Sequence, residues 1–240
     1  MLNNNEDYVR EIITDAQTLS ERSLEVDVKK DNDEVRQIVL ELKDTLRAHK
    51  NGVGLAAPQI GKNKRIFVIN FNGDIRTFIN PIITQVKGMA LNREGCLSLP
   101  DKEYIVPRFN EINVMYQTPL AKTESKKFLG LAAYIFQHEL DHLEGIILSD
   151  IGLEVGSEFD NATEEEKAQI INMYLESLDL KKKDLDKEIE ENPELKKTKD
   201  AIDFMTKVQK GEVKVEFEKV DEETSKKIDE KLKSSIKNDK

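Results

Sequence analysis

The feature that most constrains this chain is the run Gln137-His138-Glu139-Leu140-Asp141-His142, near the end of an apolar stretch that begins at Phe128. In a helix, residues four apart lie on one face, so His138 and His142 can present two imidazoles to one metal ion. Glu139 lies at the edge of that face, where a carboxylate can reach a water on the metal without being a ligand. The run therefore predicts a helix that carries a hydrolytic metal site. The alternative is an ordinary amphipathic helix with surface or core histidines.

The composition limits the class of protein. Of the 240 residues, 38% are hydrophobic and 35% are charged, and the net charge of -10 disfavours nucleic acid as a main partner. The single cysteine excludes an internal disulfide and predicts a reducing compartment, so we expect a cytoplasmic protein. We expect neither a targeting segment nor a membrane-spanning run, and we predict no sequence-specific contact with nucleic acid. The sequence predicts no particular oligomeric state.

Hydrophobic spacing predicts the elements that precede the motif. We expect a short helix around Val9 to Thr14, an extended piece around Leu24 to Val28 and a helix that runs from Asp33 to Asn51-Gly52. Five strands should follow, with a hairpin turn at Asn72-Gly73, a strand end at Gly88, and either an edge or a break at Pro107. Their predicted ranges are 65–70, 75–80, 82–87, 104–106 and 112–116.

Two short segments between these elements could belong to a site. The segment from Gly52 to Gln59 is too small and too rich in glycine to be a packed helix or a strand. It is either a backbone that approaches a ligand or a plain connector. The segment from Glu94 to Pro100 holds Cys96, which is either a small buried hydrophobe or the third metal ligand that two histidines still need. Gly95 would let the backbone pack close to that site.

The composition changes after about residue 157. Residues 161–240 contain 18 Lys and Arg and 22 Asp and Glu, which is half of that segment. We therefore divide the chain into a catalytic domain, residues 1–157, and a charged, mostly helical C-terminal extension, residues 158–240. Thr163 and Glu166 form a capping box ahead of a helical stripe that ends near Leu180. A second helix should open at Asn192-Pro193, followed by a strand over 213–217 and a helix from Ile228.

Taken together, the segments Gly52 to Gln59, Glu94 to Ser98 and His138 to His142 resemble the three signature motifs of the peptide deformylases, in that family's order. The resemblance implies an α+β fold with antiparallel β-sheets around a central metal-binding helix. It also implies removal of the N-formyl group from the initiator methionine of newly synthesised polypeptides. Because the extension is acidic and longer than a single helix, the resemblance does not imply that it docks to ribosomal RNA, and association with the ribosome stays open.

The resemblance also implies roles for individual residues. Cys96, His138 and His142 would hold one divalent metal ion, Fe²⁺ in the native enzyme, with Zn²⁺, Ni²⁺ or Co²⁺ as substitutes. Water on this metal would attack the formyl carbon, with Glu139 as general acid and base. The side chain of Gln59 and the backbone N–H of Leu97 would stabilise the oxyanion. The peptide-binding residues would be Val53 and Gly54, which hold the backbone, and Leu131, Tyr134 and Ile135, which line the methionine pocket.

Two other interpretations stay open. A zinc peptidase shares the histidine pattern but would take its third ligand from Glu144, Glu154 or Glu158, because no histidine follows His142. A deformylase fold that has lost catalysis would serve as a binding module. In addition, Glu103 stands where bacterial members often carry a basic residue, which leaves the preference beyond methionine open.

Overall fold

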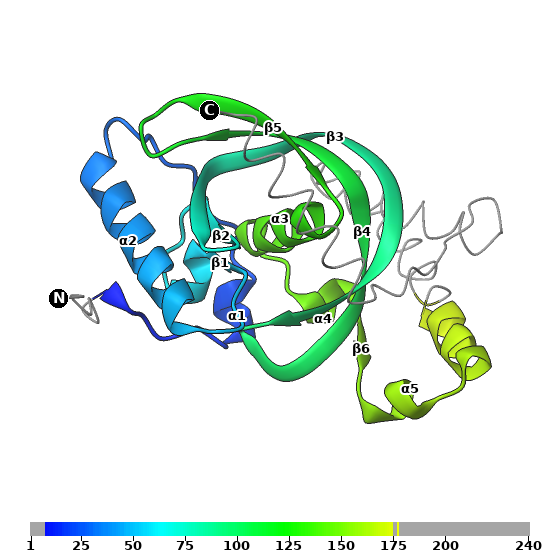
Figure 1. The fold of residues 1–240 in the computed structure, drawn as a ribbon. Coiled ribbons are helices and arrows are strands. Elements are labelled where there is room, and N and C mark those ends of the chain that lie inside the picture. Colours follow the sequence, from blue (N-terminus) through cyan, green and yellow to red (C-terminus); the bar gives the residue numbers. More distant parts are fainter. Residues whose placement is uncertain (1–7, 175–176, 178–240) are drawn as a thin grey trace, which may run out of the picture.

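The fold encloses helix α3 (Leu131–Leu143) inside a curved sheet (Figure 1). The computed structural model describes residues 8–174 and residue 177. The helices are α1 (Ala16–Leu19), α2 (Asn32–Ala48), the 3-10 helix η2 (Ala57–Ile60), α3 (Leu131–Leu143), α4 (Leu148–Ile151) and α5 (Ser157–Asn161). A further helix covers 164–174. The strands are β1 (Gly54–Ala56), β2 (Ile66–Phe71), β3 (Asp74–Cys96), β4 (Leu99–Gln117), β5 (Thr123–Leu129) and β6 (Leu153–Val155).

These strands form one antiparallel sheet in the order β1-β2-β3-β4-β5, and β6 pairs with an earlier stretch of β4 than β5 does. The expected antiparallel arrangement around α3 is confirmed, but the strands form one sheet where more than one was expected. Strands β3 and β4 are long enough to curve around α3, and register shifts between Ile79 and Ile82 and between Ile83 and Gln85 interrupt their regular pairing. Such irregularities increase twist and bend a strand pair, which lets a single sheet wrap around a helix.

Both faces of β2 are buried over residues 66–69, which explains why that part of the strand is apolar. Ile66 and Val68 point toward α2 and belong to a first core cluster with the apolar side of that helix. Phe67 and Ile69 point to the other face and belong to a second cluster with α3. Phe136 of α3 lies edge-on to Phe67 at 5.0 Å between ring centroids. Helix α3, which carries the two motif histidines, is thus held in place by an aromatic core.

Several sequence expectations hold, and others are wrong. Helix α2 and the β2–β3 hairpin at Asn72-Gly73 are confirmed, as is the capping box, in which Glu166 N donates to Thr163 Oγ1 at 3.3 Å. No helix forms over 9–14; there the N–H of Ile13 donates instead to the carbonyl of Gln59 at 2.8 Å. The segment 52–59 is not purely irregular, since it contains β1 and most of η2.

The predicted strand end at Gly88 does not occur, because β3 continues past it, whereas of the two alternatives at Pro107, an edge or a break, the structure has the edge. Pro107 lies inside β4 opposite Leu91, between the part of β4 that pairs with β6 and the part that pairs with β5. In the described chain no strand pairs with that short stretch of the β4 edge. A proline is tolerated where its missing N–H would have faced an unpaired edge.

Expectations for the extension can be followed only in part. The helix over 164–174 agrees with the predicted helix up to the last described residues. The helix expected from Asn192-Pro193, the strand over 213–217 and the helix from Ile228 lie outside the described residues. None of the described helices is long and apolar enough to cross a membrane.

Candidate active site

Helix α3 presents the two histidines from the centre of the sheet. It starts after Gly130, whose φ is 54°, and ends before Gly145, whose φ is 74°. A Cβ atom at Gly145 would lie 2.4 Å from the carbonyl oxygen of Ser20, so only glycine fits this close approach. The position at which α3 stops is therefore fixed by packing as well as by backbone conformation.

Three potential metal ligands converge in front of α3. Cys96 lies at the end of β3, and its Sγ is 3.3 Å from Nε2 of His142. Ligand atoms of Cys96, His138 and His142 all lie within 4.8 Å of one another. One sulfur and two imidazoles form a donor set suited to a borderline or soft divalent ion, and three protein ligands leave a position open for water. The residues present therefore fit a catalytic metal.

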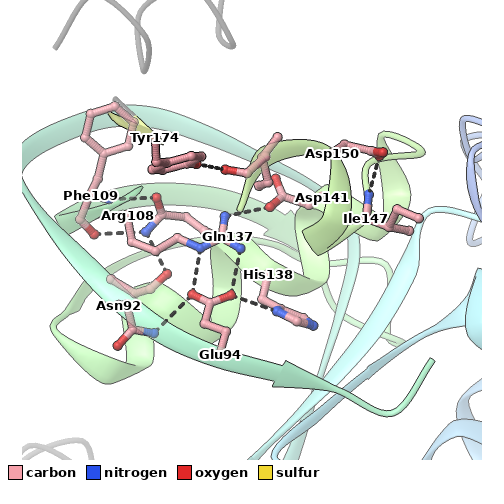
Figure 2. A network of polar contacts seen from close by, with 12 residues as sticks. Asn92, Glu94, Arg108, Phe109, Gln137, His138, Asp141, Ile147, Asp150 and Tyr174 are labelled. Atoms are coloured by element: carbon pink, nitrogen blue, oxygen red, sulfur yellow. Dashed lines mark hydrogen bonds and ion pairs between the residues drawn. The ribbon is translucent and has the colours of Figure 1, made fainter. Parts of the chain in front are cut away.

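A buried polar network supports His138 from behind (Figure 2). The Nδ1 atom of His138 is 2.9 Å from Oε2 of Glu94, so Nε2 faces the ligand group. Arg108 donates two hydrogen bonds to Glu94, at 2.8 and 2.9 Å, and one to Asp141, at 2.6 Å. Asn92 also donates to Glu94, at 3.0 Å. Every acceptor oxygen of Glu94 thus has a partner, and the ring of His138 is fixed in orientation.

Burial alone would oppose ionisation of Glu94. The charge of Arg108 and the hydrogen bonds from Arg108 and His138 outweigh this effect, so the pKa of Glu94 lies well below its usual range. Glu94 is consequently an anion at neutral pH and can accept a hydrogen bond from the imidazole. Sequence reasoning missed Glu94 and Arg108, although Glu94 stands two residues before Cys96, and residues two apart in a strand share a face.

Gln137, the residue before His138, joins the same helix to β4. Its Oε1 accepts from the N–H of Phe109 at 2.9 Å, and its Nε2 donates to the carbonyl of Phe109 at 2.9 Å. The Gln137 amide thus satisfies both backbone groups of Phe109, as a neighbouring strand would. It does so in the stretch of β4 that no described strand pairs with. Pro107 lies two residues before Phe109, so its backbone nitrogen points to the same edge. Because no described strand pairs with that edge, the N–H that proline lacks is not needed there.

Glu139 differs from its neighbours because its buried carboxylate is not fully hydrogen-bonded. It is 3% exposed, and its Oε2 has no hydrogen-bond partner among the described residues. Burial raises the pKa of Glu139 to about 7, although the charge of His138 acts against the shift. A Cβ atom at Gly54 would lie 2.2 Å from Oε1 of Glu139, so the glycine leaves the space that the carboxylate occupies. Such a group can take up and return a proton near neutral pH.

Gln59 is held with its amide nitrogen toward Cys96. Its Oε1 accepts from the N–H of Ala56 at 2.9 Å, and its Nε2 donates to Oγ of Ser98 at 3.1 Å. The same Nε2 lies 3.5 Å from Sγ of Cys96. Ser98, which is 1% exposed, is a second residue that sequence reasoning did not single out. Its hydroxyl and the Ala56 N–H together fix which end of the Gln59 amide faces the ligand group.

Leu97 and Gly54, two further predicted site residues, lie in a turn and in an edge strand. Leu97 and Ser98 form the two-residue turn that joins β3 to β4, directly after Cys96. The predicted reason for Gly95 is wrong, because the nearest atom to a Cβ there is the carbonyl oxygen of Lys102 at an ordinary 3.7 Å. Strand β1 lies at one edge of the sheet, with Gly54 opposite Ile69.

The predicted methionine pocket lies at the start of α3 and is partly open to solvent. Leu131 is 48% exposed, Tyr134 and Ile135 are half-buried, and the Tyr134 hydroxyl donates to Oδ1 of Asn110. Val53, the residue before β1, is 51% exposed, and its carbonyl accepts from the N–H of Asn70 at 2.8 Å.

The glutamates that a zinc peptidase would need are engaged elsewhere. Glu144 pairs with Arg65 at 2.8 Å and with Arg22 at 3.1 Å. Glu154 pairs with Lys102 at 3.0 Å. Within the described chain, the potential metal ligands that cluster are the cysteine and the two histidines, without Glu144, Glu154 or Glu158.

The sequence profile described as polypeptide deformylase matches residues 9–152, more than half of the chain. The chain belongs to the polypeptide deformylase family. Members of this family remove the N-formyl group from nascent polypeptides by metal-dependent hydrolysis, and this is the activity of the chain. It is an enzyme of protein biosynthesis, and both the resemblance seen in the three motifs and the predicted activity are confirmed.

Individual relatives agree with the family assignment. The chain is 40% identical over 127 residues to a peptide deformylase of Dictyoglomus turgidum, a match that covers 53% of this chain and 82% of that protein. A Thermomicrobium roseum peptide deformylase is 39% identical over 152 residues, covering 59% and 85%. The crystal structure of the Thermotoga maritima peptide deformylase superposes with a TM-score of 0.56 at 32% identity, covering 60% of this chain and 97% of that one. A Met-Ala-Ser-bound deformylase of Acinetobacter baumannii gives 0.55 at 29%, covering 60% and 98%.

Proposed function

We propose that the chain deformylates the N-terminal formylmethionine of nascent polypeptides in the cytoplasm, with Fe²⁺ as its native metal. Cys96, His138 and His142 hold the ion, as the convergence of their ligand atoms supports. The thiolate favours a borderline or soft ion and so excludes Mg²⁺ and Ca²⁺, and Zn²⁺, Ni²⁺ or Co²⁺ can replace iron. When bound, the metal acidifies a water and polarises the formyl oxygen.

The residues around the ligands perform the proton transfers. Glu139 takes the proton of the attacking water, since its buried carboxylate has an oxygen without a partner among the described residues and a pKa of about 7. It then returns that proton to the nitrogen of the leaving amine, so that formate and a free N-terminus form. This carboxylate is the single observation that carries the catalytic assignment.

Two donors stabilise the charge that develops on the formyl oxygen. The Gln59 amide is already oriented by Ala56 and Ser98, and its Nε2 lies 3.5 Å from Sγ of Cys96, beside the proposed position of the formyl group. The backbone N–H of Leu97, in the turn after Cys96, is the second donor. A donor that is held in place before the reaction is worth roughly 3 kcal/mol of barrier.

The peptide binds along the edge of the sheet. Val53 and Gly54 offer backbone groups at β1, and in the described chain that strand is paired on one side only, with β2. An extended peptide can add there as a further strand. Its methionine side chain then enters the space lined by Leu131, Tyr134 and Ile135. The domain boundary near residue 157 remains part of this proposal. Within the extension, the helix that follows Thr163 supports the fold, and residues 193–240 are a peripheral element.

The test is formate release from a short formyl-Met peptide by protein that is kept free of oxygen and whose metal content has been measured. We expect turnover with the formyl peptide and none with the matching acetyl-Met peptide. The Cys96→Ala variant should lose the metal and the turnover together. Full metal retention by Cys96→Ala would overturn the ligand assignment, and a wild-type protein loaded with iron that releases no formate would overturn the function.

A further inference from the structure

The segment that follows the family match contacts the support of the metal centre. The match ends at residue 152, whereas β6, α5 and the helix over 164–174 come after it. From this helix Ile171 is buried, and it belongs to a core cluster with Met89, Ile105 and Val155. Phe109 and Tyr174 pack against the same cluster. The described part of the extension therefore packs against β3 and β4.

One route leads from this cluster to the first histidine. The ring of Phe109 packs under the extension, and the backbone of Phe109 is held in both directions by the amide of Gln137. Gln137 directly precedes His138 in α3. Displacement of Phe109 would therefore shift the turn of α3 that carries this imidazole.

A second route leads to the sulfur ligand. The hydroxyl of Tyr174 donates a hydrogen bond to the carbonyl of Ile151 at the end of α4, beside the Arg108 network (Figure 2). Ile151 packs in a cluster with Leu148, Tyr104 and Val106, and Cys96 packs against that same cluster. Tyr174 thus holds the end of α4, and α4 contributes Leu148 to the cluster against which Cys96 packs.

Tyr174 is also close to the buried charge of the network. Burial raises the pKa of Tyr174, and the charge of Arg108 is near enough to act against this shift. Tyr174 therefore lies near the ion pairs that Arg108 makes with Glu94 and Asp141 (Figure 2).

We propose that residues 157–174 are a positioning element of the metal centre, in which Ile171 and Tyr174 hold Phe109 and α4 in place and so slow the escape of the metal. This inference rests on the proposed function, because it takes Cys96, His138 and His142 as the metal ligands. It goes beyond that function because it assigns a task to a segment outside the family match. Residues one layer outside a metal site commonly change its metal affinity by about 10- to 100-fold.

The experiment measures how fast Zn²⁺ passes from the loaded full-length protein to an excess of a chromogenic chelator. We expect Ile171→Ala to release the ion about tenfold faster than wild type, and Tyr174→Phe, which loses only the hydroxyl, about threefold faster. Met173→Ala on the same helix should release it at the wild-type rate, since Met173 is 70% exposed. If Ile171→Ala does not fold, Ile171→Val should still release the ion faster than wild type.

A second control separates positioning from general stability. Val28 is 4% exposed and belongs to the first core cluster, next to α2. Val28→Ala should lower the melting temperature as Ile171→Ala does, yet leave the release rate unchanged. Equal release rates for these two variants would overturn the inference, as would wild-type rates for both Ile171→Ala and Tyr174→Phe. A wild-type protein that binds no Zn²⁺ would instead overturn the proposed metal site itself.

Discussion

His138 and Glu139 are neighbours in α3, yet they differ in how many hydrogen-bond and charge partners surround them. Behind His138, the network of Glu94, Arg108 and Asp141 supplies each charge with a counter-charge and hydrogen bonds. Glu139 is only 3% exposed, yet one of its carboxylate oxygens has no partner in the described chain. The first region holds a ligand still, and the second keeps a proton acceptor available. One helical turn therefore combines a rigid support with a reactive group.

The pKa values express the same difference. Glu94 and Glu139 are both buried carboxyls, and the pKa of Glu94 is lowered while that of Glu139 is raised to about 7. The cause is the position of Arg108, which contacts Glu94 directly and acts on Glu139 only as a weaker, more distant charge. Environment, not residue type, separates the carboxylate that supports His138 from the proposed proton acceptor.

The largest expected effect comes from removing the cation of the support. Arg108→Met should cost about 3–5 kcal/mol of unfolding free energy, because Glu94 and Asp141 would lose a buried partner. The measurement is urea unfolding. The matched control is Arg93→Met, whose ion pairs with Glu103 and Asp160 are exposed and should contribute less than about 1 kcal/mol. Similar costs for the two variants would remove the distinction between support and surface.

The next effect concerns the reactive group. Glu139→Gln should lower turnover of a formyl-Met peptide by about 100-fold or more, because the amide cannot accept the proton of the attacking water. Metal content should stay at the wild-type level, since Glu139 is not in the ligand group. Turnover per bound metal is the quantity to measure. A near-normal value would exclude Glu139 from the proton transfers.

Glu94→Gln should show the opposite pattern. The variant keeps the shape of the side chain but loses the charge that accepts from His138, so metal affinity should fall by about 10- to 100-fold. Competition with a chelator of known affinity measures this loss. Once the metal is restored at saturating concentration, turnover should return to within about threefold of wild type, in line with a role in orientation and not in chemistry. A lasting loss at saturation would show that Glu94 acts in the reaction.

The smallest effect is a pH dependence of stability in metal-free protein. The pKa of Glu139 is raised from 4.5 to about 7, so the folded state binds more protons than the unfolded state between these values. Stability should therefore fall as pH rises from about 5 through 7, and this fall should be absent in Glu139→Gln. Melting temperatures of both proteins at pH 5.5 and pH 8.5, with chelator present, test the difference. Parallel changes in the two proteins would contradict the assigned pKa.

Local spacing was enough to predict the metal helix, helix α2 and the β2–β3 hairpin, because each depends on residues close in sequence. The polar support of His138 could not be predicted in the same way. Glu94 and Arg108 meet only because β3 and β4 run unbroken past Pro107. The sequence allowed either an edge or a break at this proline, so it did not determine which residue of β4 lies beside Glu94. The role of Gln137 likewise depends on an unpaired stretch of strand edge, which no sequence periodicity reveals.

The helix expected over 9–14 fails for a related reason. Its spacing suits a helix, but the backbone of Ile13 is used to hold Gln59 in the first motif. The Gln59 amide in turn needs Ser98, from the second motif, to face the ligand group. Contacts between segments far apart in the sequence thus override local preference where the site is assembled.

The most direct test of this division of labour measures metal content and formate release on the same samples of wild type, Glu139→Gln and Glu94→Gln. The predicted result is a double dissociation. Glu139→Gln should carry a full complement of metal and have about 1% or less of the wild-type turnover per metal, whereas Glu94→Gln should carry less metal and turn over normally for each ion it retains. If Glu139→Gln loses its metal, or if both variants lose turnover per metal to the same degree, the separation of support from reactive group is contradicted.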